Sequence, residues 1–303
     1  MLQTLKSLAD PSRLRLTAIL LRGEFTVQEL TRIMGTGQSR VSHHLKALTE
    51  AGVLAVKRQG TWNYYRAGGD SPFFAAIRPA LEQGLADLPH REEDLTAVAQ
   101  ILEERRDRSR EFFDRHARQW DDLARTLLPA PDYREILLSR LPQGKSVVEI
   151  GLGTGGLLPA LAARSATVIG VDHSPAMLDE ARRRLTEENV SGVELRLGEM
   201  THLPLTDRSA DCAVLAMVLH HAADPQAVLG EIKRVLVPGG LLLVADLARH
   251  EREWVRERLA DQWLGFDEEE LTAWLTAAGF VQIDCRRIAG SVGQESVLVL
   301  TAS

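Results

Sequence analysis

Apolar and polar residues change their spacing along the chain, and this change separates three segments. From about residue 145 onward, short apolar runs alternate with longer stretches in which apolar residues recur every three to four positions. The first pattern is typical of buried strands and the second of amphipathic helices. The expected strands are 145–150, 166–171, 193–197, 211–216, 240–246, 280–287 and 296–301, and the expected helices are 155–164, 175–187, 224–236 and 267–278. Such alternation predicts an α/β fold with a doubly wound, mainly parallel sheet.

The first seventy residues follow a different pattern, in which short helices precede two β-rich runs. Polar residues such as Asp10 and Thr26 stand before the apolar-periodic stretches and glycines stand after them, as is typical of helix ends. The expected helices are 10–23, 26–33 and 38–51, and the expected strands are 53–56 and 62–65, joined by a basic turn at 57–61. This order predicts a small α+β winged helix-turn-helix domain.

Residues 92–125 form a connector in which acidic and basic residues are mixed, as on solvated helix faces. We expect one or two long helices here. Phe112, Phe113, His116 and Trp120 form an aromatic-rich group within them. Core packing is the default explanation for aromatic residues at helical spacing.

The composition is that of a globular protein, with 45% hydrophobic and 26% charged residues among 303. No apolar run approaches the ~20 residues that a membrane-spanning helix needs, and residues 1–6 lack the apolar core of a signal peptide. Cys212 and Cys285 are far apart, which argues against a disulfide scaffold or a cysteine-built zinc site. We therefore expect a cytoplasmic protein with no membrane partner.

Charge is distributed unevenly, although a net charge of −6 argues by itself against a nucleic-acid ligand. Residues 1–70 contain ten Lys and Arg against five Asp and Glu, so this segment carries +5 and the rest of the chain −11. A basic N-terminal unit on an acidic body fits local binding of DNA phosphates. The residues predicted to contact DNA lie on the third helix and on the wing: Gln38, Ser39, Arg40, Ser42, His43, Lys46, Arg58, Gln59 and Thr61.

Three stretches of this segment carry a family resemblance: Leu8–Leu14 (LADPSRL), Val41–Leu48 (VSHHLKAL) and Ala51–Leu54 (AGVL). They resemble the arsenic-repressor (ArsR) family of winged-helix regulators over about residues 1–88. The resemblance implies binding of a double-stranded DNA operator as a homodimer, with a helix in 71–88 helping to pair the subunits. Metal-sensing members would carry cysteines around Thr26–Leu30, and this chain has none there. We therefore predict no metal site.

The stretch Val147–Gly156 (VVEIGLGTGG) ends a strand and breaks into glycines before a helical pattern, an arrangement that lets backbone approach a nucleoside. The glycine spacing alone does not choose the ligand. Gly151, Gly153 and Gly156 fit a dinucleotide motif, whereas Glu149 with Gly151, Gly153 and Gly155 fits domains that bind S-adenosylmethionine (SAM). Asp172, after the second strand, is placed to hold ribose hydroxyls in either case.

Three downstream stretches favour SAM: Gly198–Met200, Ala216–His221 and Arg234–Gly240. Together they resemble class I SAM-dependent methyltransferases, most closely a small-molecule group related to quinone-biosynthesis enzymes, over about residues 110–303. The resemblance implies a Rossmann-like, seven-stranded domain that binds SAM or S-adenosylhomocysteine (SAH). It also implies a set of cofactor-binding residues, with the last two of them on a lid: Glu149, Gly151, Leu152, Gly153, Gly155, Asp172, His173, Met177, Glu199, Met200, Ala216, His221, His116 and Trp120.

Methyl transfer requires an aligned acceptor and often a general base. His220 and His221 are the candidate catalytic residues, because a neutral imidazole accepts a proton near pH 7. His221 equally fits a residue that leads into a helix. Asp246 and His250 belong to a second polar cluster, with Glu251 and Trp254, that is a candidate wall of a substrate pocket.

The expected organisation is an ArsR-type DNA-binding and dimerisation domain at 1–90, a helical linker with a possible cofactor lid at 91–142, and a methyltransferase-like domain at 143–303. The favoured hypothesis is a transcriptional regulator, a repressor, with SAM or SAH as effector. The alternative is an active SAM-dependent small-molecule methyltransferase with an appended regulatory winged helix. Metal-responsive repression is the least favoured hypothesis.

Overall fold

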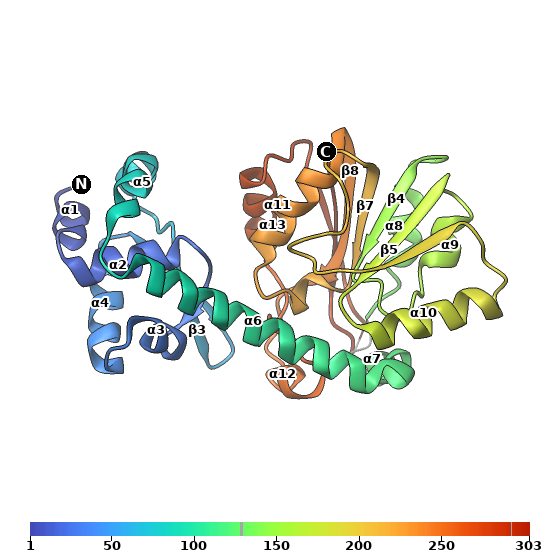
Figure 1. The fold of residues 1–303 in the computed structure, drawn as a ribbon, viewed down its shortest axis with the longest axis horizontal. Coiled ribbons are helices and arrows are strands. Elements are labelled where there is room, and N and C mark those ends of the chain that lie inside the picture. The colour runs from blue at the N-terminus through green and yellow to red at the C-terminus, as the bar shows by residue number, and fades with distance from the viewer. Residues whose placement is uncertain (128–129, 292) are drawn as a thin grey trace. The chain divides into compact units, whose positions relative to one another are not determined.

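The structure is a computed structural model that describes residues 1–127, 130–291 and 293–303 (Figure 1). It contains two compact units, Met1–Arg105 and Arg106–Ser303. The long helix α6 (Arg91–His116) contributes residues to both units. Each unit is described below by itself.

The first unit is a winged helix-turn-helix. Its helices are α1 (Leu2–Leu8), α2 (Pro11–Leu20), α3 (Val27–Met34), α4 (Gln38–Glu50) and α5 (Pro72–Gly84), with a short 3₁₀ turn η1 (Leu85–Asp87). An antiparallel sheet has the order β1-β3-β2, with β1 at Phe25–Thr26, β3 at Trp62–Ala67 and β2 at Leu54–Gln59. The predicted helices and hairpin are confirmed. Helix α1 was not predicted, because its short sequence carries no side-chain cap.

Local sequence explains where these helices begin and end. The Asp10 side chain accepts a hydrogen bond from the backbone N–H of Arg13, and Pro11 starts α2 with its backbone angle already fixed. Thr26 and Glu29 form a reciprocal capping box at the start of α3. Gly35, with φ of +61°, ends α3 in the left-handed conformation that glycine adopts at little cost. Because α3 ends at Gly35, the chain can turn before α4 begins.

The wing differs from the prediction in its length and in its exposed face. Strand β2 continues to Gln59, which pairs with Trp62, so the turn contains only Gly60 and Thr61 rather than residues 57–61. Strand alternation then turns Lys57 and Gln59 inward, with only 8% and 1% of their surface exposed. Gln59 is therefore corrected from an exposed wing-tip residue to a buried strand residue.

The core of the first unit joins its helices to α6. Leu16, Leu30 and Leu45 are completely buried, and Val98 and Ile101 of α6 belong to the same apolar cluster. The first half of α6 is thus part of the winged-helix core. This explains why the compact unit extends to Arg105, beyond the residue 90 expected from the sequence.

The second unit has the predicted doubly wound α/β fold. Its seven-stranded sheet has the order β6-β5-β4-β7-β8-β10-β9. The strands are β4 (Ser146–Ile150), β5 (Thr167–Asp172), β6 (Val193–Leu197), β7 (Ala210–Ala216), β8 (Leu236–Leu247), β9 (Asp284–Ile288) and β10 (Val297–Ala302). Neighbouring strands from β6 to β8 are parallel, and β10 is antiparallel to both of its neighbours.

Helices cover both faces of this sheet, with α9 (Leu158–Ala162) and α10 (Pro175–Glu187) on one side and α11 (Pro225–Val235) and α13 (Glu268–Ala277) on the other (Figure 1). The remaining helical elements are η2 (Ala117–Gln119), α7 (Trp120–Leu127), α8 (Arg134–Ser139), η3 (Leu219–His221) and α12 (Val255–Arg258).

Two predicted elements of this unit are shorter than expected. Helix α9 starts at Leu158 rather than residue 155, because Gly153 and Gly155 have positive φ and prolong the turn before it. Strand β9 starts at Asp284 rather than residue 280, because Gln282 has a φ of +49°, outside the strand region. No helix in residues 1–127, 130–291 and 293–303 combines the length and the hydropathy of a membrane span.

Candidate functional site

A cavity lies beyond the carboxyl ends of β4 and β5 and beside the segment after β7. Strand β4 pairs with both β5 and β7, so strand order reverses here, where open α/β sheets bind their ligands. The empty space in the cavity and at its opening to solvent is about 510 Å³. Its lining residues are Ser109, Phe113, Trp120, Ile150, Gly151, Gly153, Val171, Asp172, His173, Met177, Gly198, Met200, Met217, Val218 and His221.

Three glycines shape the turn under this cavity, and each has a positive φ. A Cβ atom on Gly151 would lie 2.1 Å from Val218 Cγ2, and one on Gly155 would lie 3.0 Å from Ala181 Cβ. These two positions need glycine for packing. Among residues 1–127, 130–291 and 293–303, a Cβ on Gly153 would meet only Trp120 Nε1, at 4.0 Å, so glycine there keeps the cavity open.

Asp172, at the end of β5, holds the glycine turn against the start of α10. Its Oδ2 accepts a hydrogen bond from the backbone N–H of Gly153 at 2.9 Å, and its Oδ1 accepts one from the N–H of Ser174 at 2.9 Å. Burial raises the pKa of this carboxyl group, and this outweighs the opposing effects of the nearby His173 and of these bonds. A buried acidic side chain is thereby presented at the cavity wall.

The last turns of α6 and the start of α7 supply aromatic residues to the cavity. Phe113 and Trp120 pack edge to face, with ring centroids 4.9 Å apart, and Phe113 has the same centroid distance from His221. The Asp114 side chain accepts a hydrogen bond from Ser174 Oγ at 2.6 Å, which ties α6 to the start of α10.

The two proposed lid residues have different positions. Trp120 lines the cavity, whereas His116 does not; its ring stacks on Phe112 with centroids 4.3 Å apart. Ser109 and Phe113 were missed as site residues. They lie at positions i and i+4 of α6 and therefore share one face of that helix, a signal that was available in the sequence.

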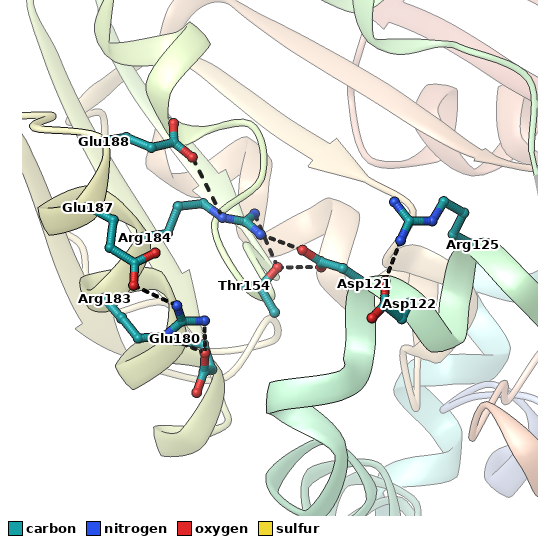
Figure 2. A network of polar contacts seen from close by, with 9 residues as sticks. All are labelled: Asp121, Asp122, Arg125, Thr154, Glu180, Arg183, Arg184, Glu187 and Glu188. Carbon is teal, nitrogen blue, oxygen red and sulfur yellow. Dashed lines mark hydrogen bonds and ion pairs between the residues drawn. The ribbon is translucent and has the colours of Figure 1, made fainter.

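A polar network attaches α7 to the glycine turn and to α10 (Figure 2). The Asp121 carboxylate accepts a hydrogen bond from Thr154 Oγ1 at 2.6 Å and pairs with Arg184. Burial raises the pKa of Asp121, but the bonds from Thr154 and Arg184 outweigh burial and leave the pKa below its usual value. Asp122 pairs only with Arg125 in this network, within the same helix.

Changing Asp121 to Asn is expected to loosen α7. The side chain is half exposed, so solvent screening limits the loss to about 1 kcal/mol, or about a fivefold increase in local opening. Amide hydrogen exchange of residues 120–127 measures this opening. Asp122→Asn is the matched control and is expected to leave exchange unchanged; equal effects of both variants would contradict the assigned contact.

The adjoining part of the site contains Glu199. A smaller pocket of about 280 Å³ shares Ser109, His173 and Met200 with the main cavity. Glu199 lines the smaller pocket but not the main cavity. Glu199 lies 3.7 Å from His173 Nδ1 and 3.8 Å from Arg110 Nη1. The nearby His173 imidazole is the main cause that lowers the pKa of Glu199.

Of the residues predicted to bind a cofactor, eight line the main cavity: Gly151, Gly153, Asp172, His173, Met177, Met200, His221 and Trp120. Glu149, Leu152, Gly155 and Ala216 do not. Leu152 packs into the apolar core, and Glu149 is buried at the strand end, where burial and the charge of Asp172 raise its pKa to about 8.

The two candidate catalytic histidines lie in η3 and have opposite electrostatics. His221 lines the cavity, and its pKa is lowered well below the usual value by burial and by the neighbouring charge of His220. His220 does not line the cavity. Burial lowers its pKa, but Asp246 and Asp261 outweigh this and raise it to about 9. His221 is therefore the neutral imidazole at pH 7.

Comparison with known families agrees with this geometry. The model for the methyltransferase domain matches residues 148–244, and the model for bacterial regulatory proteins of the arsR family matches residues 10–56. A probable S-adenosylmethionine-dependent methyltransferase of Mycolicibacterium smegmatis is 30% identical over 182 residues, which cover 54% of this chain and 68% of that protein. The chain belongs to the SAM-dependent methyltransferase family. It joins an ArsR-family helix-turn-helix domain to a class I methyltransferase domain.

Two further similarities define what is shared. An uncharacterized 37.1 kDa protein of transposon TN4556 from Streptomyces fradiae is 42% identical over 131 residues, 42% of this chain, and the match spans only 37% of that protein. A SAM-dependent methyltransferase of Thermotoga maritima, a possible histamine N-methyltransferase, has a TM-score of 0.52 at 24% identity, over 64% of this chain and 99% of its own. This last likeness shows the methyltransferase fold alone.

Proposed function

We propose that this methyltransferase-family protein is a DNA-binding transcriptional regulator, a repressor, whose methyltransferase domain binds SAM or SAH as effector. The observation that carries the proposal is the double membership of α6. Its first half is part of the winged-helix core, and its second half forms a wall of the cavity. One continuous helix therefore belongs to the DNA-reading unit and to the cofactor site.

The residues of the cavity fit SAM or SAH. The open face of Gly153 accepts the methionine part, and the buried acceptor Asp172 suits the ribose hydroxyls. Met177 and Met200 offer apolar contact to adenine, and Glu199 in the adjoining pocket suits the adenine amine. When bound, the sulfonium of SAM supplies a methyl group that a nucleophile can take.

The DNA-reading surface in this proposal is the exposed face of α4 with the tip of the wing. All six predicted residues of α4 are exposed, as are Arg58 and Thr61 of the wing. They offer the guanidinium, ammonium, hydroxyl and imidazole groups that reach phosphates and base edges. Gln59, being buried, is left out of this surface.

Coupling between the two sites requires that the effector favour one arrangement of the regulator over another. On the DNA side, α6 is tied down by Asp94, paired with Arg15 at 2.6 Å, and by Arg105, paired with Glu29 at 2.8 Å. On the cofactor side, Phe113 and Asp114 contact the cavity and the start of α10. A ligand that moves Phe113 and Asp114 therefore acts on the same helix that carries Asp94 and Arg105.

The proposal also includes a homodimer formed through the winged-helix unit, in the cytoplasm. Helix α5 supports this dimer, since Phe73, Ile77 and Leu81 are only partly buried within one chain. Two copies of α4 would then read two half-sites of an operator.

A second candidate function is methyl transfer to a small molecule, and His221 is the observation that favours it. Its ring lines the cavity and is neutral at pH 7, as a general base requires. Transfer of the methyl group in a substrate screen, lost in His221→Gln but not in His202→Gln on the surface, would establish this activity.

The regulator is tested by measuring DNA affinity with and without each ligand. Operator duplexes are first selected from a random library with the full chain and then titrated alone, with SAM and with SAH. At least one ligand is expected to change the affinity about fivefold or more, the lower end of usual allosteric couplings.

Arg40→Ala is expected to weaken DNA binding about tenfold or more without altering ligand binding, and the surface variant Arg182→Ala is expected to change neither. Affinities that are identical with and without both ligands would refute the proposal.

A further inference from the structure

We propose that the second unit contains a binding site for a divalent transition-metal cation, formed by His220, His221 and Asp261. One ligand atom from each of these side chains lies within 4.8 Å of the other two. All three residues are buried, with 3% to 6% of their surface exposed. This site goes beyond the proposed function and does not depend on it.

The distances are close to those of a metal site. His220 Nε2 lies 3.9 Å and His221 Nδ1 lies 3.7 Å from Asp261 Oδ1. Tetrahedral zinc with bonds of about 2.0–2.1 Å places its ligand atoms ~3.3 Å apart. To reach this spacing, each of these two histidine nitrogens has to move about half an ångström closer to Asp261 Oδ1.

The charges of His220 and Arg256 act on the buried Asp261 carboxylate, but hydrogen bonds to it are missing from the described part of the chain. Neither of its carboxylate oxygens has a hydrogen-bond partner among the described residues, although only 3% of the residue is exposed. A buried carboxylate without partners is costly and uncommon. The two imidazole nitrogens that face it do not come within hydrogen-bond distance. A cation between the three side chains would satisfy the Asp261 carboxylate, and at His221 Nδ1 it would replace a contact of 3.4 Å with the Ala260 carbonyl.

His220 has the outer contact expected of a metal-binding histidine. Its Nδ1 lies 2.7 Å from Asp246 Oδ1, while Nε2 faces Asp261. Asp246 is in turn fixed by the backbone N–H groups of Leu219 and Leu247, at 2.8 and 2.7 Å. Carboxylates that orient a histidine in this way are the usual second layer of metal sites.

The backbone keeps Asp261 beside the two histidines, although about forty residues separate them in sequence. The N–H groups of Gln262 and Trp263 both donate to the carbonyl of His220 at 3.0 Å, and the Trp263 indole N–H donates to Ala222 at 2.8 Å. The loop is thus held against η3. Because these segments are distant in the chain, no ligand spacing is visible in the sequence.

The donor set selects the class of ion. Two imidazoles and one carboxylate suit zinc and related first-row ions better than magnesium or calcium, which prefer oxygen ligands. Three protein ligands leave a fourth position for water or another ligand. Because His221 also lines the cavity, the ion would lie at the cavity wall.

Zinc binding tests the site directly in the full chain without DNA or SAM. After treatment with a chelator, titration with Zn²⁺ is expected to give one ion per chain with a Kd of about 1 µM or tighter. Asp261→Asn, nearly equal in shape, is expected to weaken binding about 100-fold, and Asp246→Asn to weaken it 10- to 100-fold. His202→Gln removes an exposed imidazole and is expected to change nothing.

X-ray absorption of the zinc-loaded wild-type chain gives a readout that does not depend on variants folding. It is expected to show two imidazole nitrogens and oxygen ligands. Absence of saturable binding, equal affinity in wild type and Asp261→Asn, loss of binding in His202→Gln, or a spectrum without two imidazoles would each overturn the proposal.

Discussion

Replacing Gly153 with leucine is expected to abolish binding of SAM and SAH to the methyltransferase unit while leaving its fold intact. Gly153 has a φ of +56°. A side chain there would extend toward the Trp120 indole, and both residues line the cavity. The left-handed backbone costs leucine about 1–2 kcal/mol. Overlap with the ligand is expected to cost more, so affinity falls about 100-fold or more, about 2.7 kcal/mol.

Gly144→Leu is the matched control for this experiment. Gly144 has a nearly identical φ of +63°, and no heavy atom of the described residues lies within 4 Å of its Cβ position. Its backbone strain is therefore the same, but it lies outside the lining of the cavity. Calorimetric titration measures affinity, and thermal unfolding checks that both variants are destabilised alike. Unchanged affinity in Gly153→Leu would show that the ligand does not bind against this turn.

The same variant separates the two candidate functions. If the ligand acts as an effector, Gly153→Leu keeps its affinity for operator DNA and loses only the response to SAM or SAH. If methyl transfer is the function of the unit, the variant loses turnover. The substitution lies in the second unit, far in sequence from the predicted DNA-contacting residues of α4, so its effect on DNA affinity alone is expected to be small.

Sequence periodicity predicted the fold well because burial repeats regularly. Strands β4 and β7 are continuous apolar runs, and their parallel direction follows from the alternation of strands and helices. The glycine turn was also predictable, because only glycine tolerates positive φ beside Val218 and Ala181. Features with a local cause could be found from the sequence.

Two kinds of feature could not be predicted from the sequence: those that depend on which residues of a strand face inward, and those that depend on contacts between distant segments. A turn shorter than predicted changed which residues of the wing are exposed, and Gln59 moved from solvent to the interior. Asp261 reaches His220 only through bonds between distant loops. Phe113 falls between these cases, because its helical face was visible in the sequence although the cavity it lines was not.

Removing the Arg105 side chain is expected to destabilise the winged-helix unit by about 3 kcal/mol, the lower end of the loss from breaking a buried ion pair. Only 4% of the side chain is exposed. Its guanidinium donates to both oxygens of Glu29 and to the Glu24 carbonyl, and lies 5.4 Å from the ring centre of Phe25. Because Glu29 also caps α3, Arg105→Ala leaves a carboxylate without its partner at the start of the helix that precedes α4.

This loss tests whether α6 is part of the DNA-reading unit, as the effector proposal requires. Urea unfolding measures the free energy, and hydrogen exchange localises it; protection is expected to fall in α3 and β1, while β4 and β5 stay protected. Arg108→Ala, on the exposed face of the same helix, is the control and is expected to change stability by less than about 0.5 kcal/mol.

In the double variant Arg105→Ala with Glu29→Gln, removal of the uncompensated charge is expected to restore part of the stability. Equal protection in Arg105→Ala and wild type would mean that α6 is not anchored in the winged helix, and an effector site on its far half would then have no path to the DNA-contacting face of α4.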